Sequence, residues 1–207
     1  MLADFFSGGR RSWTVPIFPL NAVLFPAGAL PMRIFEARYM DMASDCLRRS
    51  RPFGVCLIRE GEEVGAPAVP ERVGCLARIA DCDAGELGVL KVRAEGGERF
   101  RITSSEVTSA GLIVAEVEEL AAEPVVTEAP GLTECAEFLR KVIAGIGEER
   151  FVQPFELGDA SWVGFRLAEI LPLRNDVRQK LLELTDAALR LAVIHRFLRQ
   201  QGLLGAP

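Results

Sequence analysis

The sequence predicts an α+β protein in which a small β barrel comes first and an α-helical part follows. Over residues 13–120, short apolar strands follow one another at hairpin spacing, with one helical pattern inserted early. This order favours a small barrel over an alternating βαβ sheet. After residue 131, apolar residues keep only the three- and four-residue spacing of helices. We therefore expect a β domain over 13–120, a linker over 121–131 and a helical subdomain over 132–207.

A proline-rich ribbon opens the β region. Its four prolines each fix φ and remove a backbone donor, so the ribbon cannot be one continuous central strand. They are Pro16, Pro19, Pro26 and Pro31. The apolar residues between them indicate short extended pieces, joined by corners, that lie against a core. From Glu36 the pattern becomes helical and predicts one buried face, made of Tyr39, Met42, Ala43, Cys46 and Leu47.

Further strands are expected where apolar runs lie between turn residues. They cover residues 53–58, 73–79, 87–94 and 112–117, with Phe100 and Ile102 on one more strand. Turns are predicted at Asp81 to Gly85 and at Glu95 to Gly97, because both segments carry typical turn residues. Residues 59–72 read as a solvated loop.

Three helices are predicted after the linker, each with a side chain able to accept hydrogen bonds from the first turn. Thr133 caps the first, which ends at Gly145 and Gly147. Asp159 caps the second, over 160–171. Asn175 caps the third, which begins at Val177 and whose apolar seam includes His195 and Leu198.

Composition excludes several classes of protein. The 24 basic and 29 acidic residues give a net charge of −5, without the basic excess of a protein that binds phosphate backbones. Five cysteines in no Cys-x-x-Cys pair and a single histidine offer no zinc site. These scattered thiols are expected to be reduced and mostly buried, as in a cytoplasmic protein. No apolar run is long enough to span a membrane, and the residues before Trp13 are expected to form a frayed tail.

The run PLNAVLFPAGALPMRIFEARYMDM resembles the opening signature of the Lon protease amino-terminal (substrate-recognition) domain family. The similarity continues through VGCLARIADC, LKVRAEGGERFRI and LIVAEVEEL, and through WVGFRLAEILPL and KLLELTDAALRL near the carboxyl end. The matching residues of the first run are Pro19, Leu20, Phe25, Pro26, Leu30, Pro31, Met32, Ile34, Phe35, Glu36, Arg38 and Tyr39. The resemblance implies a PUA-like β pseudobarrel followed by a helical subdomain.

The resemblance also implies a non-catalytic protein that binds unfolded or extended polypeptide segments, as an adaptor or regulator of proteolysis with a protease as partner. The sequence has neither the Gly-x-x-x-x-Gly-Lys-Ser/Thr loop of an ATPase nor a Gly-x-Ser-x-Gly elbow. No cofactor, metal or catalytic residue is expected. The alternative is an RNA-binding PUA-like module, against which net acidity and a single tyrosine argue. The oligomeric state stays open.

The candidate peptide-binding residues are Pro26, Leu30, Pro31 and Met32. Prolines hinder ladder pairing, so we expect part of the ribbon at the barrel edge, with apolar side chains that an extended peptide can cover. The same residues serve equally well as rigid structural corners, and both interpretations stay open.

Four further polar residues have structural interpretations that we prefer to functional ones. Arg99 is expected to pair with the carboxylate of Glu36, beside the first helix, and to hold ribbon to barrel. A place for both in a peptide groove is the alternative. Asp81 and Asp83 are expected to cap backbone amides rather than bind a cation. His195 is expected to pack on its helix seam rather than act as a general base.

Overall fold

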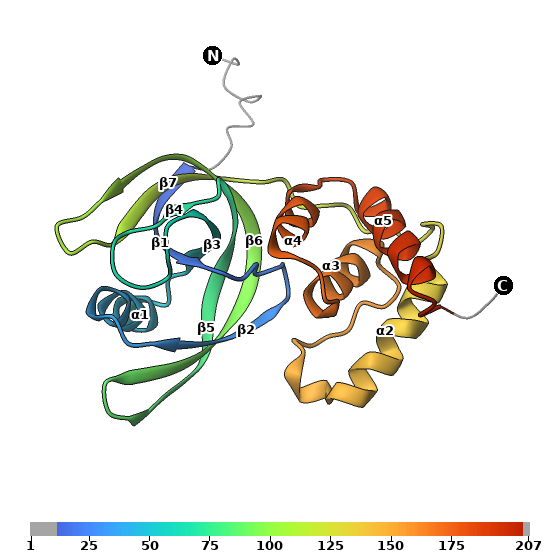
Figure 1. Cartoon of the computed structure of the whole chain (residues 1–207), viewed down its shortest axis with the longest axis horizontal. Coiled ribbons are helices and arrows are strands. Elements are labelled where there is room, and N and C mark those ends of the chain that lie inside the picture. Colours follow the sequence, from blue (N-terminus) through green and yellow to red (C-terminus); the bar gives the residue numbers. More distant parts are fainter. Residues whose placement is uncertain (1–11, 205–207) are drawn as a thin grey trace, which may run out of the picture.

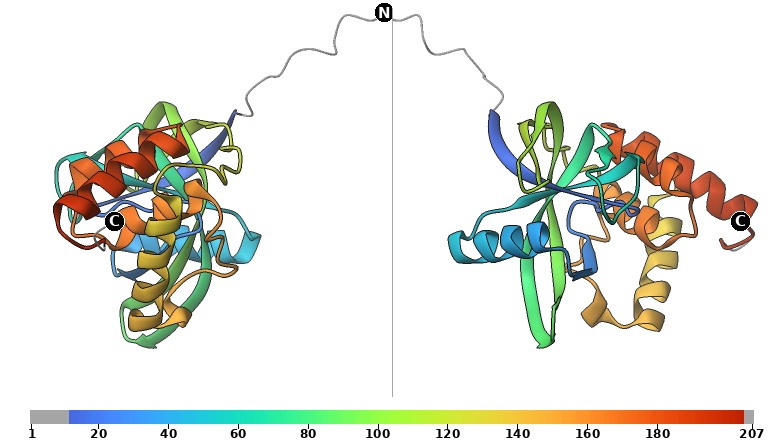
Figure 2. Two further views of the ribbon diagram at one scale, coloured as in Figure 1. Left: turned by 90° about the vertical axis from the view of Figure 1, so that its right-hand side faces the viewer. Right: turned by 60° about the vertical axis from the view of Figure 1, so that its left-hand side comes forward.

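The computed structural model describes residues 12–204 and confirms the α+β class. The amino-terminal tail expected before Trp13 lies outside the described residues, apart from Ser12. The strands are β1 (Ser12–Leu20), β2 (Ala29–Ile34), β3 (Phe53–Glu60), β4 (Val69–Pro70), β5 (Val73–Glu86), β6 (Val89–Val107) and β7 (Ile113–Glu119). The helices are α1 (Ala37–Arg49), α2 (Leu132–Ile146), the 3-10 turn η1 (Glu148–Arg150), α3 (Ala160–Ile170), α4 (Asn175–Glu183) and α5 (Ala187–Gln200). Helices α2 to α5 gather on one side of the strands and α1 lies on the other (Figures 1 and 2).

The strands form one mixed sheet that closes on itself. Neighbours run in the order β1-β7-β6-β5-β3-β4, and β1 also pairs with β3 in parallel, from Ile17 opposite Gly54 to Leu20 opposite Leu57. The parallel pairing closes β1, β7, β6, β5 and β3 into a ring, and β4 lies outside it, paired with β3. Strand β2 lies off this ring and pairs with the first half of β6. The ribbon is therefore two short strands joined by a corner, as its prolines predict.

The predicted turn at Glu95 to Gly97 is wrong, because β6 runs straight through it. Ala77 lies opposite Gly96 and Cys75 opposite Arg99, which marks a bulge in β6. A Cβ on Gly96 would lie 2.1 Å from the carbonyl oxygen of Phe25, so this glycine admits the ribbon corner. The turn expected at Asp81 to Gly85 is wrong as well, since β5 continues to Glu86 and the chain turns at residues 87–88.

The helical part confirms one predicted cap out of three. The Asp159 carboxylate accepts hydrogen bonds from the amides of Ser161 and Trp162 and starts α3. Gly131, in the left-handed region at φ 81°, precedes α2, so Thr133 is not its cap. Asn175 lies inside α4, and the predicted long third helix is broken in two because Asp186 caps α5 by accepting from the Leu189 amide.

A buried ion cluster corrects the expected pairing of Arg99 with Glu36. Arg99 Nη2 lies 2.7 Å from Glu123 Oε1, and Arg190 of α5 binds both oxygens of the same carboxylate. The Glu36 carboxylate instead accepts a hydrogen bond from Arg38, at 2.8 Å. Glu123 comes from the coil between β7 and α2, a region that the sequence marks only as a linker. Arg99 therefore joins the β part to the helices rather than to the ribbon.

The ribbon corner is held by α3. The Arg166 side chain is fully buried and donates to the carbonyls of Pro26 and Ala27. Its Nε lies 2.9 Å from Glu169 Oε2, and the other oxygen of Glu169 accepts from the Ala29 amide at 3.2 Å. Apolar residues continue this contact, because Val23, Phe25, Leu57 and Val73 share one core cluster with the helices. The division into domains at residues 121–131 stays a prediction.

All five cysteines are free, and four are buried, as predicted. Cys82 is the exposed one. The face predicted for α1 is correct except at Leu47, which is 43 % exposed.

Candidate functional site

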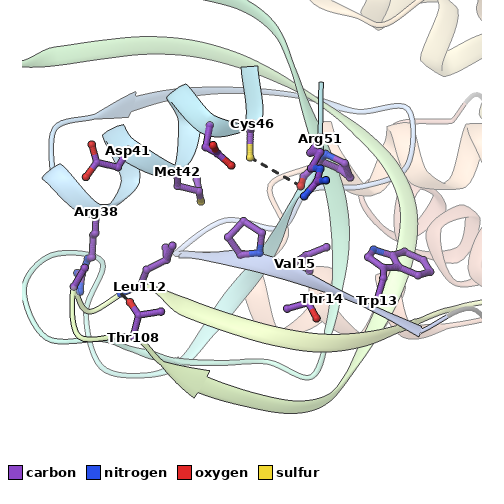
Figure 3. Close-up of a pocket in the computed structure, with 14 residues that line it drawn as sticks. Trp13, Thr14, Val15, Arg38, Asp41, Met42, Cys46, Arg51, Thr108 and Leu112 are labelled. Atoms are coloured by element: carbon purple, nitrogen blue, oxygen red, sulfur yellow. Dashed lines mark hydrogen bonds between the residues drawn. The ribbon is translucent and has the colours of Figure 1, made fainter. Parts of the chain in front are cut away.

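A groove of about 630 Å³ lies between β1, α1 and the loop that joins β6 to β7 (Figure 3). Apolar side chains form most of its walls and polar ones its rim. The lining residues are Trp13, Thr14, Val15, Pro16, Arg38, Asp41, Met42, Asp45, Cys46, Arg51, Pro52, Thr108, Ala110 and Leu112. We refer to it below as the β1 groove.

The β1 groove follows the edge of a strand. Four consecutive β1 residues, Trp13 to Pro16, line it. Successive strand residues point to opposite faces, so contact with all four places the groove beside the strand and not over one face. Strand β7 occupies the other edge and contributes no lining residue. On the groove side, pairing with β3 starts only at Ile17. This half of β1 therefore has an open edge among the described strands.

Helix α1 forms the opposite wall. Met42 and Cys46 lie one turn apart and are 4 % and 6 % exposed, which gives the groove an apolar floor. Asp41 and Asp45 precede them on the rim. The Cys46 Sγ lies 4.0 Å from the Pro52 carbonyl oxygen, beside which the chain turns into β3. Burial, together with the Asp45 charge, raises the pKa of the Cys46 thiol, so it is a protonated wall residue rather than a nucleophile.

Arg38 fixes one end of the β1 groove. Its guanidinium donates to the Gly111 carbonyl at 3.0 Å, the Gly65 carbonyl at 2.7 Å and the Glu36 carboxylate. Gly111 has φ 79°, and a Cβ there would lie 3.1 Å from Arg38 Nη1. The loop is tightened further by the Leu112 amide, which donates to Thr108 Oγ1 at 3.1 Å. The loop wall of the groove is thus held against α1 by directed bonds.

Opposite charges mark the two ends of the β1 groove. Arg51 lies at the Trp13 end, and Asp41 at the end near Arg38 and Thr108 (Figure 3). Asp45 is already paired with Arg48 and Arg49 on α1. No side-chain partner is found for Asp41 or Arg51 among residues 12–204. The β1 groove, apolar along its length and with one unpaired charge at each end, suits an extended and mainly apolar polypeptide segment.

The candidate residues from the sequence lie apart from this groove. Pro26 is in the corner held by Arg166 and lines a second pocket of about 250 Å³ with Arg99 and Glu123. Leu30 packs half-buried against the core, and Met32 is 9 % exposed. Pro31 is exposed and lines a third pocket, of about 470 Å³. The expectation of an apolar side chain open to solvent is therefore wrong for Met32, whereas the half-buried Leu30 is neither clearly exposed nor in the core.

The remaining polar candidates have structural roles. The Asp83 carboxylate accepts from the Gly85 amide at 2.9 Å and that of Asp81 from the Cys82 amide, as predicted. His195 Nε2 bonds the carboxylate of Glu134, and its ring packs where Gly131 has no side chain. Within the described part of the chain, no three His, Cys, Asp or Glu residues gather as metal ligands.

A mixed sheet closed into a ring, with one early helix and a helical part packed on its side, defines an α+β protein of the Lon amino-terminal architecture. The chain belongs to the ATP-dependent protease La (Lon) substrate-binding domain family, whose sequence model matches residues 14–200. This confirms the resemblance seen in the sequence. No protease or ATPase domain is matched, and no described helix has the length and apolar character needed to cross a membrane.

Solved structures of Lon N-terminal domains are similar to this chain. A Lon N-terminal domain protein from Xanthomonas campestris is 37 % identical, with a TM-score of 0.73 over 88 % of this chain and 96 % of that one. The N-terminal domain of Mycobacterium avium complex Lon protease is 19 % identical, with a TM-score of 0.59 over the same shares. The second likeness concerns the fold alone.

Proposed function

We propose that this protein binds unfolded or extended polypeptide in the β1 groove, without catalysis, and acts as an adaptor or regulator of proteolysis. The observation that carries the proposal is an apolar groove beside an open strand edge, in a chain of the Lon substrate-binding domain family. Unfolded segments differ from native surfaces in offering apolar side chains and free backbone groups, and the groove has a place for each.

The binding of a single segment should be weak. The β1 groove holds only a few side chains, and an unfolded segment loses conformational freedom when it is ordered. A Kd on the order of micromolar or weaker is therefore expected. An adaptor role, a protease partner and a cytoplasmic location belong to the same proposal. The assignment of Pro26, Leu30, Pro31 and Met32 to a peptide surface stays a prediction, supported now only by the exposure of Pro31.

The test measures fluorescence anisotropy of a labelled, reduced and carboxymethylated lactalbumin, which is permanently unfolded. Ala110→Trp adds bulk from the loop wall into the groove, and should weaken binding at least about tenfold, or 1.4 kcal/mol. Ser109→Trp adds the same bulk to the neighbouring exposed residue, which does not line the groove, and should bind like wild type. Equal binding by both variants would place the site elsewhere.

The RNA-binding alternative is tested in the same assay with a labelled single-stranded RNA. The net charge of −5 predicts no binding that competes with lactalbumin. Tight binding of RNA that weakens steeply with salt would favour the alternative.

A further inference from the structure

The open edge of β1 exposes a defined set of backbone groups. In an antiparallel ladder, pairs that exchange two hydrogen bonds alternate with pairs that exchange none. Pro16 lies opposite Val114 and has no N–H, so this pair belongs to the second kind. Two residues earlier, Thr14 and Glu116 are of the same kind. The N–H and C=O of Thr14 therefore point away from β7, into the β1 groove.

Side chains support this alternation. Members of a pair that exchanges no backbone hydrogen bonds lie closer together, with Cα atoms about 4.5 Å apart, so their side chains meet directly. Thr14 Oγ1 donates to the carboxylate of Glu116 across the ladder. This hydroxyl is thus used on the β7 side, while the backbone of Thr14 has no strand partner on the other side within residues 12–204.

The β1 groove lies in line with β3, beyond the amino-terminal end of that strand. Strand β3 pairs with β1 from Ile17 to Leu20, and Arg51 and Pro52 connect α1 to the start of β3. An extended segment in the groove would lie where β3 would continue beside Thr14. Its outer side would meet Met42 and Cys46 of α1, which line the groove one helical turn apart and offer apolar contact.

We propose that polypeptide binds by adding a strand to the β1 edge at Thr14. The bound segment is extended and apolar in its middle, with a carboxylate toward Arg51 and a cation toward Asp41. This inference rests on the proposed function and specifies how the groove selects its ligand. Backbone pairing supplies attraction that does not depend on sequence, and the apolar floor and the end charges supply the preference.

The protein-side test uses substitutions that separate the backbone from the side chain. Thr14→Pro removes the N–H that faces the groove, whereas Thr14→Val removes only the hydroxyl. Thr14→Pro should lower affinity about tenfold or more and keep the melting temperature within a few degrees, and Thr14→Val, which keeps the N–H, should retain clearly more affinity than Thr14→Pro. Val15→Pro, one residue on, removes an N–H directed to β7 and should destabilise the fold.

The ligand-side test uses a seven-residue peptide with Glu at one end, Lys at the other and Val and Ile between them. N-methylation of every second amide removes those hydrogen-bond donors and keeps the side chains. Two such peptides are possible, one with each alternate set of amides methylated, and only the one whose methyl groups face β1 should lose binding. A version with Gln at both ends should bind several-fold more weakly at low salt. Equal affinities for the methylated peptides and their parent would overturn strand addition.

Amide hydrogen exchange on the wild-type protein decides the case in which Thr14→Pro fails to fold. The Thr14 amide should exchange fast in the free protein and slow down when the parent peptide is added. An amide that is already protected, or unchanged by the peptide, overturns the inference. If these tests exclude strand addition but Ala110→Trp still blocks the binding of lactalbumin, the proposed function stands. If the wild-type protein does not bind lactalbumin at all, both the proposed function and strand addition are wrong.

Discussion

Arg99 of β6 and Glu123 of the coil before α2 form an ion pair of 2.7 Å, in which their side chains are 4 % and 5 % exposed. Arg190 of α5 binds the same carboxylate, and its guanidinium carbon lies 3.7 Å from the ring centre of Phe165. Burial lowers the pKa of both arginines, with Glu123 opposing the shift. One carboxylate thus serves two buried cations at the boundary between the β part and the helices.

Glu123→Ala should destabilise the protein by about 3–5 kcal/mol, because it leaves two buried guanidinium groups without their counter-ion. Chemical denaturation followed by circular dichroism gives the free energy of unfolding. Glu128→Ala, an exposed glutamate in the same coil, should change it by less than about 0.5 kcal/mol. A loss below about 1 kcal/mol for Glu123→Ala would show that the cluster contributes little to joining the two parts.

The double variant Leu30→Ser, Met32→Ser should lose about 3 kcal/mol or more, since these side chains pack against the barrel core. Thermal unfolding measures the loss. Pro31→Ser changes the exposed residue between them and should stay within about 1 kcal/mol of wild type. Unchanged stability of the double variant would restore the ribbon as an exposed apolar surface.

Cys82 should be the one thiol that a maleimide labels in the native protein. It is exposed, whereas burial raises the pKa of the other four thiols, that of Cys135 to about 12. Partial desolvation, together with the charges of Asp81 and Asp83, also raises the pKa of Cys82, so its labelling should be slower than that of an ordinary exposed thiol. Mass spectrometry should find one label on the wild type and none on Cys82→Ser. Rapid labelling of a second cysteine would contradict the packing described.

Glu169 should make stability depend on pH in a defined direction. Burial raises the pKa of its carboxyl, with Arg166 and the Ala29 amide opposing the shift. The folded protein therefore holds this proton more tightly than the unfolded chain does. The resulting stabilisation is complete below the unfolded pKa, near 4.5, and is lost as pH rises through the folded pKa.

The corresponding measurement compares wild type with Glu169→Gln, which cannot titrate. The unfolding free energy of wild type minus that of the variant should fall as pH rises above 4.5 and then become constant. A difference that rises with pH would show a lowered pKa, with the Arg166 ion pair outweighing burial.

Some local signals in the sequence predicted local structure correctly. Asp159 starts a helix because a carboxylate at that position satisfies two free amides, and this needs no distant partner. Gly96 and Gly97 led to a wrong turn prediction because both turns and β-bulges favour glycine. Only the close approach of the Phe25 backbone to Gly96 distinguishes the two cases. Arg99 was rightly expected to be paired, but its partner is set by how the helices dock, which sequence spacing does not contain.

The β1 groove could not be predicted in the same way. Its walls come from three segments, represented by Trp13, Asp41 and Thr108, that are distant in sequence and meet only when β1 closes the ring against β3. The available signal was Trp13, a large aromatic residue at the start of the first strand. The ribbon drew attention instead because its prolines form a conspicuous run, although Arg166 uses the carbonyls of its corner for structure.

The emission of Trp13 tests the central claim most directly. Trp13 lines the β1 groove, and the other tryptophan, Trp162, is 5 % exposed in the core, so Trp162→Phe leaves a single reporter in the groove. A carboxymethylated lactalbumin variant whose tryptophans are replaced by phenylalanine, used in both assays, should shift the Trp13 emission to shorter wavelength as it is titrated in. The midpoint of this shift should equal that of the anisotropy signal. Anisotropy that reports binding while Trp13 emission stays constant would contradict the claim that polypeptide enters the β1 groove.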